Sequence, residues 1–126
     1  MVIIQSKSRR KASGARYKSK IIKKRQHLIG RIPAMTKIGK TKKQNIRTRS
    51  NGQKLRLLNA EKVNLYDPKS KTYSIEAIKT VVESPADKNF VRRNIIMKGT
   101  IIATGKGNAR VTNRPGQDGI INAILI

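Results

Sequence analysis

The chain has 126 residues, about the size of one domain, and its 30 lysine and arginine residues outnumber 6 aspartate and glutamate residues, giving a formal net charge of +24. Such a chain repels itself, so we expect a polyanionic partner, either nucleic acid or an anionic membrane surface. It has no cysteine, which excludes disulfide frameworks and thiolate metal sites. The longest nearly apolar run, GIINAILI, is far shorter than the roughly 20 residues of a spanning helix. The start, MVIIQSK, lacks a signal-peptide core, so we expect a soluble, intracellular protein.

The charge is concentrated in the first part of the chain. Residues 1–56 hold 19 basic residues and no acid, whereas residues 57–126 hold 11 basic and all 6 acidic residues. This shift predicts a basic N-terminal extension, residues 1–40, followed by a folded domain, residues 41–126. The extension has one weak apolar stripe, Ile21-Ile22 and Leu28-Ile29. Because it cannot bury enough apolar surface to offset its ordering entropy, we expect it to become ordered only on a partner.

The next segment, NIRTRSNGQKLRLL, predicts a β-hairpin. Asn51-Gly52 is the strongest short hairpin signal, because a two-residue type I′ turn needs positive φ at both positions. A turn there would pair Arg49 with Lys54 and Arg47 with Arg56, so that four cations share one face. The other face would carry Ile46, Thr48, Leu55 and Leu57. Like charges opposite one another destabilise a ladder, so we interpret this face as a phosphate-binding surface rather than a solvated edge.

The rest of the chain has short apolar segments separated by turn residues. VNLYDPKSKTYSI reads as strand, Asp-Pro turn, strand, and the alternation of Tyr73, Ile75 and Ala77 slips near Ile78, which predicts a bulge. ESPADKN is expected to be a loop or one short turn, after which RRNIIMKGTIIAT resumes strand character. This spacing predicts an all-β fold, a small closed or partly open β-barrel.

The glycine-rich stretch GKGNARVTNRPGQDG raises the possibility of a phosphate-binding loop. It has neither the GxxxxGK[ST] nor the GxGxxG spacing, and a strand rather than a helix follows GKGN. We therefore interpret these glycines as turn residues that join short strands.

No catalytic or metal site is predicted. His27 is the only histidine and has no metal-binding partner nearby, and Asp67 and Asp118 lie in turns where aspartate caps its own backbone. We expect no enzyme activity, cofactor or small-molecule substrate. The aromatic residues are too few for a base-stacking platform, so we expect recognition through phosphates and shape. These residues are Tyr17, Tyr66, Tyr73 and Phe90.

Four blocks of sequence resemble one known family, the archaeal and eukaryotic type of small-subunit ribosomal protein eight. The blocks are KSRRKASGAR at 7–16, GRIPAMTKIG at 30–39, NFVRRNIIMKG at 89–99 and RPGQDG at 114–119. They are in the family's order and span nearly the whole chain, and the short length looks archaeal. Three positions depart from the family's pattern: Ser6 and Ala15 replace glycine, and His27 replaces an aromatic residue.

The resemblance implies a structural constituent of the small ribosomal subunit in the cytoplasm, whose partners are ribosomal RNA and other small-subunit proteins. It also implies a barrel with an N-terminal extension embedded in that RNA. A related factor of large-subunit biogenesis has a longer N-terminal region. The short extension of this chain therefore argues against assigning it to that factor. Ser13 and Gly14 are expected to let the backbone approach phosphate closely. The RNA-binding candidates are Arg9, Arg10, Lys11, Ser13, Gly14, Arg16, Lys23, Lys24, Arg25, Arg31, Lys37, Arg47, Arg49, Lys54, Arg56, Arg92, Arg93, Lys98 and Arg114.

The residues themselves leave two other classes of protein open. A DNA-compacting protein would share the charge but bind duplex DNA and structured RNA equally well at the same salt concentration. A membrane-surface protein would need residues 16–29 to become helical on anionic vesicles.

Overall fold

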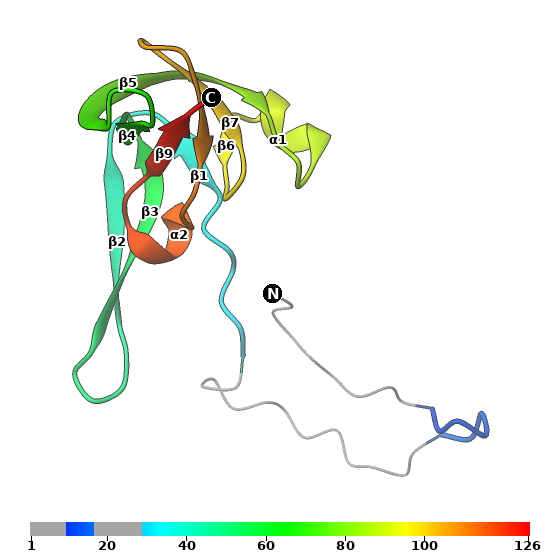
Figure 1. Ribbon diagram of the computed structural model, residues 1–126. Coiled ribbons are helices and arrows are strands. Elements are labelled where there is room, and N and C mark those ends of the chain that lie inside the picture. The colour runs from blue at the N-terminus through cyan, green and yellow to red at the C-terminus, as the bar shows by residue number, and fades with distance from the viewer. Residues whose placement is uncertain (1–9, 17–28) are drawn as a thin grey trace. The chain divides into compact units, whose positions relative to one another are not determined.

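The computed structural model describes residues 10–16 and 29–126, and it divides the chain into two units, Met1–Pro33 and Ala34–Ile126 (Figure 1). The second unit consists mainly of β-strands, as the sequence predicts. Its elements are β1 (Thr36–Ile38), β2 (Lys42–Arg47), β3 (Gln53–Ala60), β4 (Lys62–Asp67), β5 (Thr72–Glu83), α1 (Lys88–Arg92), β6 (Ile95–Ile96), β7 (Ile101–Thr104), β8 (Asn108–Val111), α2 (Pro115–Asp118) and β9 (Asn122–Leu125).

Five of these strands, β4, β5, β7, β8 and β9, form a closed barrel, which confirms the predicted fold class. The barrel is closed by a parallel pairing of β4 with β9, in which Leu65 lies opposite Ala123. Closure removes the free sheet edges that would otherwise be open to pairing with another chain.

The remaining strands form a four-stranded sheet in the order β2-β3-β1-β6. Strand β1 lies inside the residue range predicted for the N-terminal extension, yet it pairs with β3 and β6 and belongs to the folded unit. Its buried Thr36 donates a hydrogen bond from Oγ1 to the Leu57 carbonyl at 2.7 Å.

One apolar core joins the barrel and the sheet. Strands alternate their side chains between two faces, so β4 buries Val63 and Leu65 and exposes Asn64 between them. Leu57, Ala60 and Ile96 of the four-stranded sheet pack into the same cluster as the inward side chains of the barrel.

The predicted slip in β5 is confirmed. The register of β5 against β7 shifts between Ile78 and Thr80, and again between Val81 and Glu83. Tyr73 and Ile75 face outward, and Ile78, on the opposite face of the strand, is buried. The shift after Ile78 brings Val81, three residues further on, to the buried face as well. The two halves of β5 therefore present apolar side chains to opposite sides of the barrel wall.

The glycine-rich stretch contains turns, as predicted, and also one short helix. Residues 105–107 join β7 to β8, with Gly107 at φ +135°. RPGQDG contains α2, with Pro115 at its first turn, and the helix ends at Gly119, whose φ of +74° favours glycine. Asp118 accepts a hydrogen bond from the Arg114 N–H at 3.0 Å, so this aspartate caps the local backbone as expected.

The structure corrects the prediction that strand character resumes at Arg92. Arg92 is the last residue of α1 and Arg93 caps the helix, so the strand begins only at Ile95. The helix forms because the Asp87 carboxylate accepts the Asn89 N–H at 2.9 Å. An N-cap aspartate followed by a basic last turn was the signal for this helix in ADKNFVRR.

Asp67 holds the β4–β5 turn together. Its carboxylate accepts the Lys69 N–H at 2.9 Å and the Ser70 hydroxyl at 2.8 Å, and these hydrogen bonds lower the pKa of Asp67 below its ordinary value of 3.8. A lowered pKa in the folded state means that the stabilisation is present above pH 3.8 and is lost as the pH falls through the folded-state value.

We predict that NMR titration of the folded chain will find the carboxyl pKa of Asp67 below 3.8. Replacing Ser70 by alanine removes one of the two hydrogen bonds and should raise that pKa toward the ordinary value. Asp118→Asn, a change at a different turn, serves as the control and should leave the titration of Asp67 unchanged. A pKa at or above 3.8 in the wild-type chain would contradict the turn geometry.

Candidate nucleic-acid interface

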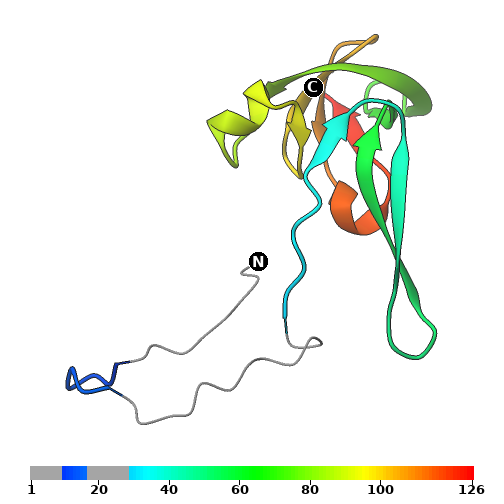
Figure 2. The same ribbon diagram turned by 180° about the vertical axis from the view of Figure 1, so that it is seen from behind.

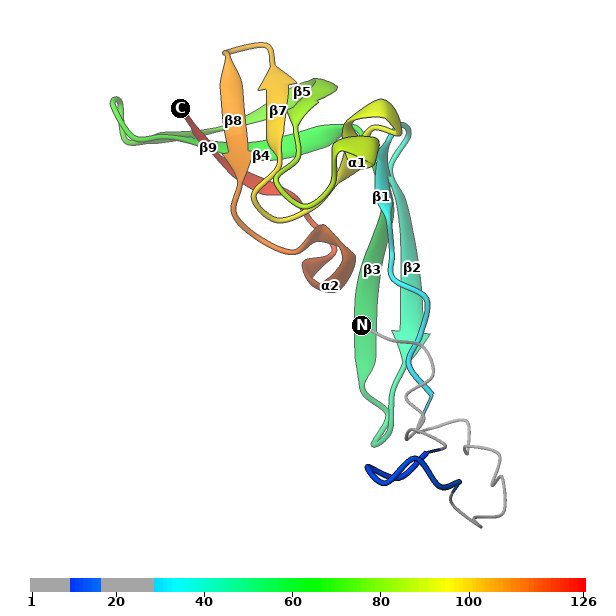
Figure 3. The same cartoon turned by 90° about the vertical axis from the view of Figure 1, so that its right-hand side faces the viewer.

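The β2–β3 hairpin, residues 42–60, is the most prominent basic feature of the folded unit. It extends past the barrel and ends in a loop well beyond α2 (Figures 1 and 3). Only its base is packed into the core, through Leu57 and Ala60. We call residues 42–60 the basic hairpin.

The register of the basic hairpin differs from the predicted one. Arg47 lies opposite Gln53 and Ile46 lies opposite Lys54, and the strands are joined by residues 48–52. Left-handed backbone occurs at Ser50 and Asn51 instead of Asn51 and Gly52, and the Gly52 N–H donates to the Arg49 carbonyl at 3.3 Å. The turn is therefore longer than two residues and begins earlier.

This change of register overturns the predicted four-cation face. From Lys43 to Arg47 the partner of each β2 residue moves by three positions, and an odd shift exchanges the faces of one strand relative to the other. Arg47 now shares a face with Leu55 and Leu57, whereas Lys54 and Arg56 share the opposite face with Ile46. Arg49 lies in the connecting loop.

The packing of β3 is the same in the observed and in the predicted register. Leu57 is buried in the core, and Leu55 lies against α2, where a Cβ added to Gly119 would meet Leu55 Cβ at 3.0 Å. Figure 2 shows α2 beside β3. Both leucines therefore face the barrel, as they would in the predicted register, and the longer loop changes only which β2 side chains share their face.

The basic hairpin consequently carries cations on both faces and at its tip. Arg47, Arg49 and Lys54 are exposed, and Arg56 is half-buried. Lys43, which was not among the predicted candidates, is exposed on the Arg47 face. Its position beside Lys42 in a basic pair was visible in the sequence, but only the register assigns it to a face.

Three further RNA-binding candidates follow β5, the longest strand of the barrel, in the sequence. Arg92 and Arg93 are exposed at the end of α1, and Lys98 is exposed in the turn between β6 and β7. In that turn the Thr100 hydroxyl accepts the Met97 N–H at 3.1 Å, which holds the loop that carries Lys98. Two more candidates are also exposed: Lys37, which was predicted in the N-terminal extension and lies on β1, and Arg114 at the start of α2.

Residues 10–16 form a small loop of their own. Arg10 and Arg16 form an antiparallel bridge, the Lys11 N–H donates to the Ala15 carbonyl at 2.7 Å, and the Gly14 N–H donates to the Lys11 carbonyl at 3.0 Å. Gly14 has a φ of +82°, and a Cβ built there would meet nothing within 4 Å. The loop gathers three predicted cations around an open stretch of backbone.

The other candidates of the N-terminal region are placed as follows. Ser13 is exposed in the same loop, and Arg31 is exposed in the first unit. Arg9, Lys23, Lys24 and Arg25 lie outside the residues that the structure describes, as does His27.

The carboxylates are too few to neutralise all the basic side chains of the chain. The chain has six carboxylate side chains and thirty lysine and arginine side chains. Asp67, Asp87 and Asp118 accept hydrogen bonds from nearby backbone N–H groups, and Glu76 pairs with Lys106 at 3.4 Å. The chain therefore has a large excess of positive charge, which favours a polyanionic partner.

The residues that the structure describes contain neither a metal-binding cluster nor a membrane-spanning helix. Within residues 10–16 and 29–126, no group of three or more histidine or acidic side chains could hold a metal ion. Among the same residues, no helix is long and apolar enough to cross a membrane.

Comparison with known proteins gives one consistent result. Residues 4–126 match the family described as ribosomal protein S8e. The chain is similar to a protein named small ribosomal subunit protein eS8 from Methanococcoides burtonii, with 48% identity over 122 residues and 97% of each chain covered. A protein of the same name from Methanobrevibacter smithii is 48% identical over 126 residues, and one from Picrophilus torridus is 43% identical over 126 residues, both over the full length of each chain.

Proposed function

Because the chain belongs to the ribosomal protein S8e family, we propose that it holds small-subunit ribosomal RNA in place by contacts to backbone phosphates. Membership makes it a small-subunit ribosomal protein of the cytoplasm and not an enzyme, as the sequence predicted. It assembles with ribosomal RNA and with other proteins of that subunit.

The observation that carries the proposal is the distribution of cations on the basic hairpin. A flat basic face can contact one phosphate strand, whereas a projecting hairpin with cations on both faces can contact phosphates on two sides at once. Lys43 and Arg47 serve one side, Lys54 and Arg56 the other, and Arg49 the tip. Cations on the edge strand β2 also discourage pairing with another chain, but that role does not require cations on β3.

The N-terminal region supplies the second part of the proposed interface. We propose that the extension is embedded in RNA and that the 10–16 loop presents Arg10, Lys11 and Arg16 to phosphate, with backbone contact at Ser13 and Gly14. Since β1 belongs to the folded unit, we place the end of the extension at Pro33. The remaining predicted candidates, Arg9, Lys23, Lys24, Arg25, Arg31, Lys37, Arg92, Arg93, Lys98 and Arg114, stay part of this proposal.

The test is sedimentation of the tagged chain from a cell lysate through a sucrose gradient, with washes at rising salt. We expect the chain to stay in the small-subunit peak at salt that removes loosely bound basic proteins. With the purified chain and small-subunit RNA, about 10 phosphate contacts should give a slope of log affinity against log salt between roughly −7 and −9.

Other results would identify a different partner. Equal affinity for duplex DNA and ribosomal RNA at the same salt concentration would indicate a general polyanion-binding protein. Recovery with membranes, together with helix formation on anionic vesicles, would indicate a membrane-surface protein. Either result would contradict the proposed function.

A further inference from the structure

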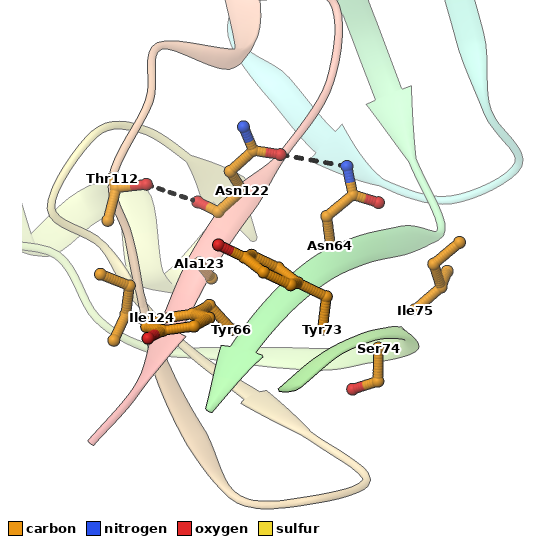
Figure 4. A pocket seen from close by; sticks show the side chains of 9 residues that line it. All are labelled: Asn64, Tyr66, Tyr73, Ser74, Ile75, Thr112, Asn122, Ala123 and Ile124. Carbon is orange, nitrogen blue, oxygen red and sulfur yellow. Dashed lines mark hydrogen bonds between the residues drawn. The ribbon is translucent and has the colours of Figure 1, made fainter. Parts of the chain in front are cut away.

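The outer wall of the barrel has a second exposed surface, which the basic hairpin does not include. Strand register places Tyr66 opposite Tyr73, with Ile124 of β9 on the other side of Tyr66. In the next row, Asn64 lies between Ile75 and Asn122. These six residues line a hollow of about 670 Å³ (Figure 4). We call them the tyrosine face.

The apolar members of the tyrosine face are unusually open to solvent. Tyr73 is 81% exposed, Ile75 69% and Ile124 40%. Tyr66 is half-buried, and its ring centroid lies 4.9 Å from that of Tyr73. Tyr66 thus supports Tyr73 from one side while most of the Tyr73 ring stays accessible. These apolar side chains lie on neighbouring strands, so one bound group can contact them together.

The polar members of the tyrosine face are held in place and have unused hydrogen-bonding capacity. Asn64 Nδ2 donates to Asn122 Oδ1 at 3.0 Å, and the Thr112 hydroxyl donates to the Asn122 carbonyl at 3.2 Å (Figure 4). This leaves Asn64 Oδ1 as an acceptor and Asn122 Nδ2 as a donor. If the amide oxygen and nitrogen atoms of both residues were exchanged, one hydrogen-bond acceptor and one donor would still be left.

The charge around the tyrosine face is mainly positive. Arg110 of β8 lies opposite Ile124, and Lys69 and Lys71 lie in the turn that joins Tyr66 to Tyr73. The one acidic residue of that turn, Asp67, is hydrogen-bonded to Lys69 N–H and Ser70. A ligand bound here would meet aromatic, amide and cationic groups together.

We propose that the tyrosine face binds an unpaired nucleobase of the ribosomal RNA, stacked on Tyr73, with its edge toward Asn64 and Asn122 and its phosphates near Arg110 or Lys71. Stacking on aromatic side chains together with hydrogen bonds to base edges is how proteins recognise single-stranded RNA. A protein partner with an aliphatic surface would bury the remaining acceptor of Asn64 and the remaining donor of Asn122 without hydrogen bonds, which is unfavourable. The proposal rests on the proposed function, and it adds base contact to a protein expected to contact phosphate and shape alone.

The test compares full-length variants on two RNA probes: a blunt duplex, and the same duplex with an unpaired overhang. Tyr73→Leu keeps an apolar side chain but removes the ring, and Tyr73→Phe keeps the ring. We expect Tyr73→Leu to bind the overhang probe about five- to twentyfold more weakly than wild type and the blunt duplex equally well. Tyr73→Phe should behave as wild type. Val82→Ala, at an exposed apolar residue of β5 outside the tyrosine face, is the control and should change neither affinity.

The outcomes separate this proposal from the proposed function. If Tyr73→Leu binds the overhang probe as tightly as wild type, base stacking is overturned while phosphate binding stands. If wild type binds neither RNA more tightly than duplex DNA, the proposed function itself fails. In intact small subunits, ultraviolet cross-linking should attach a nucleotide to Tyr73, and a cross-link to another protein alone would show that the tyrosine face is a protein contact.

Discussion

Replacing Arg47, Arg49 and Lys54 together by glutamine is expected to weaken binding to small-subunit ribosomal RNA about 100-fold at 0.1 M salt, because three phosphate contacts would be lost. The slope of log affinity against log salt should become about 2–3 units shallower. Filter binding across a salt series measures both quantities. All three side chains are exposed, so the fold should be unaffected, and half-buried Arg56 is left in place.

The matched control changes the same amount of charge elsewhere on the folded unit. Lys62, Lys79 and Lys88 are exposed and lie outside the basic hairpin. Their triple glutamine variant should lose much less affinity, because only the general field of the protein is reduced. Equal losses of affinity in the two variants would show that the basic hairpin contributes no more to RNA binding than the three control lysines do. Unchanged affinity and slope in the hairpin variant would show that it does not contact RNA.

The second large effect is on stability. Ile102 of β7 is fully buried, with Val81 of β5 on one side and Ala109 of β8 on the other. We expect Ile102→Ala to lower the free energy of unfolding by about 2–5 kcal/mol, because the lost side chain leaves a cavity in the core that joins barrel and sheet. Urea denaturation followed by circular dichroism measures the change.

The control for Ile102 is the same substitution at an exposed isoleucine. Ile75 is 69% exposed on β5, so Ile75→Ala should change the free energy of unfolding by no more than about 0.5 kcal/mol. Similar losses at the two positions would mean that the outer face of β5 is packed as tightly as the core. That result would also contradict an open tyrosine face.

The sequence alone determined the features that depend on composition and on local patterns. Short alternating strands and glycine turns are local signals, so the all-β class and the slip near Ile78 could be predicted. The glycine spacing at 105–119 is likewise a local signal, and it excluded both phosphate-loop patterns. The net charge can be counted without a structure, and it alone indicated a polyanionic partner.

The tertiary structure decided which side chains share a surface. The hairpin register goes with the longer 48–52 loop, in which the Thr48 N–H donates to the Gly52 carbonyl at 2.7 Å, and local turn preference at Asn51-Gly52 did not anticipate it. Barrel closure pairs Leu65 with Ala123, far apart in sequence, and the same pairing of β4 with β9 brings Ile124 beside Tyr66. The chain has few aromatic residues, but this small number did not exclude an aromatic surface on the folded protein. Side-chain type is a property of the sequence, whereas the neighbours that make a site depend on long-range register, which is set by how the whole core packs.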